Sequence, residues 1–128
     1  MAIKLTTERH PDHLRFELAG KRILGEFAVE MTKVWSEVAR ECEASGLTLV
    51  LGVSNLTGPA RVADIYQSAI AGCEMLQGSR CTRVAFAVLG GGAALEENRF
   101  GETIATTRGL DVRMFASEQA ALAWLRSG

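Results

Sequence analysis

Three short apolar segments alternate with amphipathic segments, and this alternation constrains the fold more than any other feature of the sequence. Residues 47–53 (LTLVLGV), 83–89 (RVAFAVL) and 110–115 (LDVRMF) have the length and composition of strands. The first two are almost entirely apolar, as is typical of strands that are covered on both faces. The segments between them carry apolar side chains at intervals of three and four residues, which indicates helices that pack with one face.

Four helices are expected. The clearest covers about residues 25–45, a second runs from Pro59 to Gln77, and a weaker third covers about residues 93–108. A last helix begins after Ser117, whose side chain can cap it. The stripe of the first helix consists of Phe27, Met31, Val34, Trp35, Val38 and Cys42.

The N-terminal segment has a different pattern. Residues 2–8 and 14–18 alternate as strands, and the turn residues RHPDH between them predict a β-hairpin. The resulting order is β-β-α-β-α-β-α-β-α. Strands that alternate with helices form a mainly parallel sheet. The sequence therefore predicts an α/β fold for residues 1–128. It is a single domain with a mainly parallel mixed sheet, an N-terminal β-hairpin and four helices.

Composition and charge exclude several classes of protein. The chain has 128 residues and a net charge of −1, so it lacks the basic excess of a nucleic-acid-binding protein. No tract of about 18 apolar residues exists, and we expect no membrane-spanning segment. The first residues lack the apolar core of a secretory signal. The three cysteines have no CxxC spacing, which favours free thiols in the cytoplasm.

Three stretches of the sequence carry a family resemblance. They are LTLVLGVSNLTG, TRVAFAVLGGG and LDVRMFASEQAALAWL, the last of which contains the pattern F-x-S/D-x-x-x-A-L-x-W-L. In order and pattern they resemble the STAS-like superfamily, in particular its SpoIIAA-like branch. This resemblance implies a compact α/β domain without intrinsic catalysis. The best-known members are anti-sigma-factor antagonists, which bind a partner kinase and are switched by phosphorylation of a serine in a D-S-S-G-L-type motif.

The corresponding stretch here is residues 55–59 (NLTGP). The resemblance implies that Gly58 matches the glycine of the motif and that Thr57 stands near the phosphoacceptor position. The paired serines and the preceding acid of the motif are absent, and Gly52 replaces the acid that is common at the end of the strand. The SpoIIAA-like fold is also similar to the lipid-binding Sec14 domains, which implies an apolar ligand as a second possibility.

Three functions follow as hypotheses, and one of them, an enzyme that uses the loops 52–58 and 90–92, lacks a recognisable base or metal site in the sequence. The other two involve binding. The first is a non-enzymatic regulatory domain that binds a protein partner through the loop 54–60 and the helix after it, using Ser54, Thr57, Gly58 and Asp64. The second is a carrier of a small, lipid-like apolar ligand. Its pocket would lie between the sheet and the first two helices, lined by Trp35, Val38, Ile65, Tyr66 and Ala69, with Gly90, Gly91 and Gly92 as further contacts. A homodimer is compatible with both hypotheses.

The two tryptophans and the three consecutive glycines are open to more than one interpretation. Trp35 and Trp124 lie on apolar stripes and are most simply core residues, but either could line a pocket or a subunit interface. The glycines at 90–92 follow a strand, yet the P-loop and G-x-G-x-x-G spacings are missing, and Glu96 and Glu97 would repel a phosphate. A turn is favoured there, and some ligand contact remains possible.

The sequence contains no convincing catalytic or metal site. His10 and His13 flank Asp12, but a zinc site normally needs three or four protein ligands, so a solvated turn is the better interpretation. Ser54 and Thr57 have no histidine near them in the sequence to act as a base. We therefore expect no catalytic residues, no metal and no cofactor.

Overall fold

The computed structural model describes residues 2–59, 61–89 and 92–127, the side chains of 92–98 excepted. The described elements follow the predicted order, and the α/β fold class with its N-terminal hairpin is confirmed. They are β1 (Ile3–Arg9), β2 (Leu14–Lys21), α1 (Phe27–Ser45), β3 (Leu49–Thr57), α2 (Val62–Gln77), β4 (Arg83–Val88), α3 (Gly92–Thr107), β5 (Asp111–Phe115) and α4 (Glu118–Arg126).

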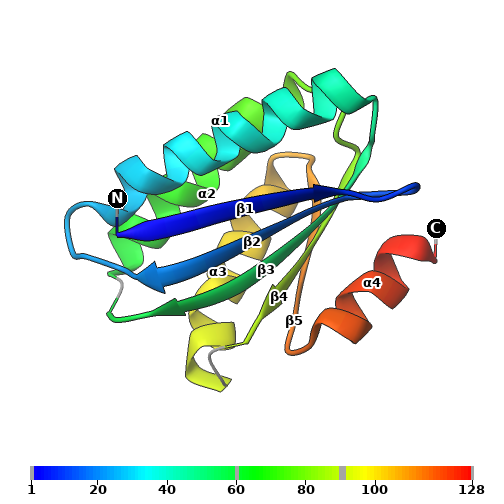
Figure 1. The fold of residues 1–128 in the computed structure, drawn as a ribbon. Coiled ribbons are helices and arrows are strands. Elements are labelled where there is room, and N and C mark those ends of the chain that lie inside the picture. The colour runs from blue at the N-terminus through cyan, green and yellow to red at the C-terminus, as the bar shows by residue number, and fades with distance from the viewer. Residues whose placement is uncertain (1, 60, 90–91, 128) are drawn as a thin grey trace.

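The five strands form one sheet in the order β1-β2-β3-β4-β5. β1 is antiparallel to β2, and the other neighbours are parallel. Each parallel connection moves one strand in the same direction, and right-handed crossovers in one direction place their helices on the same face. Figure 1 shows this result, with α1, α2 and α3 on one face of the sheet and α4 on the other. Because the strand order never reverses, the sheet lacks the switch-point crevice where many α/β proteins bind ligands.

Each face of the sheet has its own core, since alternate residues of a strand point to opposite faces. The core beneath α1, α2 and α3 contains large rings, among them Phe16, Trp35 and Phe86. The core beneath α4 is smaller and is built from Leu51, Val53, Ala85, Ala87, Ala121 and Leu125. The face that carries three helices therefore holds the larger volume.

β3 is longer than its sequence predicts. It continues to Thr57, whereas the sequence predicts a loop from Ser54 onward, and that prediction is wrong. The reason is pairing with β2, which itself extends to Lys21, so that Leu18 to Lys21 lie beside Ser54 to Thr57. The local residues SNLT favour a turn, but the neighbouring strand supplies the hydrogen bonds of a sheet. As a result, α2 begins at Val62 rather than at Pro59.

Two helix caps lie where the sequence predicts them, at Ser117 and Gly46. Ser117 accepts a hydrogen bond from the Ala120 N–H, so the predicted cap of α4 is confirmed. Gly46 ends α1 with a φ of 76°, a left-handed conformation that favours glycine. Within the described part of the chain, no helix has both the length and the apolar character needed to cross a membrane.

Candidate functional site

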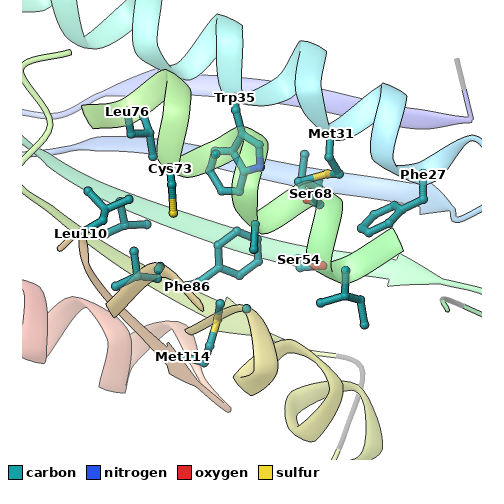
Figure 2. A pocket seen from close by; sticks show the side chains of 18 of the residues that line it. Phe27, Met31, Trp35, Ser54, Ser68, Cys73, Leu76, Phe86, Leu110 and Met114 are labelled. Carbon is teal, nitrogen blue, oxygen red and sulfur yellow. The ribbon is translucent and has the colours of Figure 1, made fainter. Parts of the chain in front are cut away.

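A pocket lies between the sheet and the three helices of the larger core (Figure 2). Its volume is about 70 Å³, and it is partly open to solvent. This is roughly half the 150 Å³ or so at which an engineered apolar cavity binds benzene, so a ligand as large as benzene would extend through the open side of the pocket. The described lining residues are Leu18, Arg22, Phe27, Met31, Trp35, Ser54, Leu56, Ile65, Ser68, Ala69, Gly72, Cys73, Leu76, Val84, Phe86, Gly101, Ala105, Leu110, Val112 and Met114.

Three aromatic rings beside the pocket form a cluster. The ring centroids of Phe16, Trp35 and Phe86, which we call the aromatic cluster, are 5.6 to 6.1 Å apart in all three pairs, so the rings form a triangle. Glycines lie against two of these rings: a Cβ on Gly52 would be 2.5 Å from Cζ of Phe16, and one on Gly72 would be 3.1 Å from the Trp35 indole. The cluster therefore packs against β3 and α2 at positions that have no side chain.

The pocket wall carries a few polar groups. Ser54 of β3 and Ser68 of α2 are 8% and 7% exposed. The indole nitrogen of Trp35 is buried and has no hydrogen-bond partner among the described residues. Arg22 is the charged residue of the described lining, and its guanidinium donates to the Gly58 carbonyl through Nε at 3.0 Å and Nη2 at 2.6 Å. An apolar wall with a small number of polar groups is typical of a small-molecule site.

One thiol faces the pocket. Burial raises the pKa of Cys73 above its ordinary value, so the group is a protonated thiol at neutral pH. The thiolate is the reactive form of cysteine, and Cys73 is therefore a poor nucleophile. The described side chains contain no cluster of three or more groups that could hold a metal ion.

The two histidines of the hairpin turn interact with each other and with neighbouring carboxylates. His13 is 3% exposed, and its Nδ1 lies 2.7 Å from Oδ1 of Asp12. The rings of His10 and His13 stack with centroids 4.6 Å apart, and Arg126 of α4 donates to Asp12 at 2.8 Å. The prediction of a solvated turn is therefore wrong for His13, because the hairpin turn packs against the end of α4.

The arrangement of elements matches a solved structure. That structure is a crystal structure of an uncharacterised protein of the DUF3478 family, with a SpoIIAA-like fold, from Shewanella loihica PV-4. The match has a TM-score of 0.54 and 22% sequence identity, and it covers 97% of this chain and 94% of the other. The chain has a SpoIIAA-like fold. No protein-family model and no curated protein matches the sequence.

The SpoIIAA-like fold places the four predicted partner-binding residues in different environments. Ser54 lines the pocket, and Asp64 is 5% exposed and pairs with Arg61 at 3.2 Å. Gly58 has a φ of 90° and is half-buried. Only Thr57, among these four, is exposed. It ends β3, five residues before α2 begins, so it does not lie in the first turn of the helix.

Of the predicted pocket residues, Trp35, Ile65 and Ala69 line the pocket. Val38 does not, because it packs fully buried in the core below α1. Tyr66 does not either: it follows Ile65 by one residue, which turns it about 100° around the helix, and it is 44% exposed. Among the three glycines, Gly90 and Gly91 lie outside the described residues, and Gly92 begins α3.

Sequence reasoning missed several lining residues, of which Ser68 is the most informative. A single serine in a helix is no functional signal by itself. However, residues three and four apart share a helix face, and Ser68 lies between Ile65 and Gly72 at that spacing. Following this face of α2 to its end would have found Ser68 together with Leu76. The lining from β4 and β5, such as Phe86 and Met114, depends on the sheet and has no local signal.

Proposed function

We propose that this SpoIIAA-like domain binds a small, mainly apolar molecule in the pocket between the sheet and α1, α2 and α3, and that it has no catalytic activity. The observation that carries the proposal is a pocket of about 70 Å³ that is partly open to solvent and lies within the larger core. Protein interiors contain few spaces larger than a water molecule, and a pocket with an apolar wall and a few polar groups is typical of a small-molecule site.

The chemistry of the wall supports binding rather than catalysis. The described lining contains no His, Asp, Glu or Lys that could act as a general acid or base. The hydroxyls of Ser54 and Ser68 therefore lack an activating partner within the described lining. The raised pKa of Cys73 keeps its thiol protonated.

A second candidate function is the docking of a protein partner on the outer side of α2 and α3. Val62 is 68% exposed, Tyr66 44% and Phe100 40%, and the rings of Tyr66 and Phe100 lie 6.4 Å apart. Exposed apolar side chains that gather in one place are typical of interaction surfaces. This candidate keeps the regulatory hypothesis but moves its contacts from Ser54 and Asp64 to the outer helix faces.

Native mass spectrometry of the freshly purified protein, followed by denaturation of the same sample, tests the first candidate. We expect an extra mass that disappears on denaturation, and a rise in melting temperature when ethylbenzene is added to protein freed of its ligand. Gly72→Ala should weaken both effects, because the new Cβ adds a methyl group to the pocket wall and the Trp35 ring must shift by a few tenths of an ångström to admit it. The cost of that crowding is offset by about 1 kcal/mol of gained helix propensity, so the variant should fold.

Gly78→Ala is the matched control, since it lies at the end of the same helix and its Cβ would meet nothing within 4 Å. It should bind as the wild type does. A wild-type protein with no extra mass and no response to ethylbenzene would contradict the proposal. A dimer in the same spectra that Val62→Asp dissociates would favour the second candidate.

A further inference from the structure

We infer that the ligand of this pocket carries a hydrogen-bond-accepting oxygen, in a carbonyl or hydroxyl group, on an otherwise apolar body. The inference rests on the proposed function and names the chemical class of its ligand. Its first support is Trp35, which is 9% exposed and whose Nε1 has no partner among the described residues. An indole N–H can only donate. Folded proteins rarely leave such a buried donor unpaired, and an accepting group in the pocket would pair it.

The direction of this N–H follows from the contact with Gly72. A Cβ on Gly72 would lie 3.1 Å from Cε2, 3.1 Å from Nε1 and 3.3 Å from Cδ1 of Trp35. Nearly equal distances to three adjacent ring atoms place that Cβ over the face of the ring rather than at its edge. The N–H bond lies in the ring plane, so it points along the side of α2 and not into its backbone. Figure 2 shows the indole nitrogen on the side of the ring toward Met31 and Ser68.

Two hydroxyls lie in the same part of the pocket. Ser54 and Ser68 line it from β3 and α2, and both are more than nine-tenths buried. Among the hydrogen bonds between described residues, none involves either hydroxyl. Figure 2 shows both serines toward one end of the pocket and Leu76 and Leu110 toward the other. An oxygen near the serines and an apolar body near the leucines would match this distribution.

Acetophenone and ethylbenzene form a suitable pair of probes, because both carry a two-carbon group on a phenyl ring and differ mainly in the carbonyl oxygen. We expect acetophenone to bind about 3- to 10-fold more tightly by calorimetry, the ratio that one hydrogen bond between uncharged groups supplies. The NMR resonance of the Trp35 indole N–H should move downfield with acetophenone and not with ethylbenzene. Trp124→Phe assigns that resonance, since the chain has two tryptophans.

Variants test the individual donors. Trp35→Phe removes the N–H and keeps an aromatic ring, and it should reduce the preference for acetophenone to less than 2-fold. Should this variant fail to fold, Ser54→Ala and Ser68→Ala test the same preference without changing the aromatic cluster. Ser36→Ala is the matched control, because Ser36 is exposed on α1 next to Trp35. It should leave the preference unchanged.

The outcomes separate the inference from the proposed function. Equal affinities for the two probes, with an unmoved indole resonance, would overturn the oxygen-bearing ligand and leave the apolar pocket standing. Binding of neither probe would instead count against the proposed function itself. A preference for acetophenone that survives in Trp35→Phe and in both serine variants would also overturn the inference, because the donors named here would not be its source.

Discussion

The two faces of the sheet are built in different ways. Under α4, the strands present small side chains such as Ala85 and Ala87, and Ala121 and Leu125 of the helix pack in the same core. Under α1, α2 and α3, the aromatic cluster lies in the core and the pocket lies beside it. Small side chains let a helix approach a sheet closely, whereas large rings are harder to pack without leaving gaps. We call the face under α4 the closed face and the face that carries the pocket the hollow face.

At the edge of the closed face, ion pairs also link α4 to β2 and to the hairpin turn. Arg15 of β2 donates to Glu118 of α4 at 2.8 Å, and Arg126 donates to Asp12 of the hairpin turn at the same distance. The guanidinium of Arg83 lies 4.1 Å from the centre of the Trp124 ring. Surface ion pairs contribute little to stability by themselves. They orient α4, while burial of its apolar side chains holds it.

The largest expected effect compares the same truncation on the two faces. Leu125 and Leu76 are 1% and 2% exposed, and Leu→Ala at such sites costs about 2–5 kcal/mol. We expect Leu125→Ala to fall in the upper half of this range and Leu76→Ala in the lower half, because Leu76 borders the pocket and has fewer contacts to lose. Denaturant unfolding measures both. Equal losses would mean that the hollow face is packed as tightly as the closed one.

A smaller loss of stability is expected from a substitution at Gly52, where the aromatic cluster packs against β3. Gly52→Ala would bring a Cβ to 2.5 Å from Phe16 and 2.9 Å from Phe86, and overpacking of this kind costs about 1–3 kcal/mol. Phe16→Leu removes the nearer ring atoms, so the double variant should lose less than the sum of the two single losses. The coupling between the two substitutions follows from the free energies of unfolding of the wild type, the two single variants and the double variant. Additive losses would show that the new Cβ at position 52 does not clash with the Phe16 ring.

The smallest expected effect is a loss of α4 stability at low pH. The hydrogen bond from Arg126 holds the pKa of Asp12 well below its ordinary value, and Arg15 lowers the pKa of Glu118 in the same way. A lowered folded-state pKa stabilises the fold above the unfolded pKa of about 4, and the stabilisation is lost as the pH falls through the folded value. The hydrogen-exchange protection factors of α4, which correct for the intrinsic pH dependence of amide exchange, should therefore fall below about pH 4 while those of α1 stay high.

The control for the acid experiment is Glu118→Gln combined with Asp12→Asn, which removes both titrations. In that variant, the protection factors of α4 should no longer change with pH over the same interval. If α1 and α4 lose protection together in the wild type, the ion pairs of Asp12 and Glu118 do not stabilise α4 selectively, and this prediction is wrong.

The sequence predicted most of the fold and only part of the pocket. Periodic apolar positions fixed the order of strands and helices, because that pattern is local. The end of β3 was missed at Ser54, since its strand conformation depends on pairing with β2, which no local pattern reports. Trp35 was predicted as a possible pocket residue, but Val38 on the same stripe packs in the core. The residues of an apolar helix stripe that border the pocket depend on side chains from distant strands, such as Phe86, and these have no local signal in the sequence. The role of Gly90 and Gly91 stays a prediction.

Gly72 brings the backbone of α2 against the face of the Trp35 ring, and this close approach has a mechanical consequence. Ser68 lines the pocket from α2, and Val62 and Tyr66 on the first turns of the same helix are exposed. A reorientation of the Trp35 ring that displaces α2 would therefore also move the exposed apolar side chains of this helix.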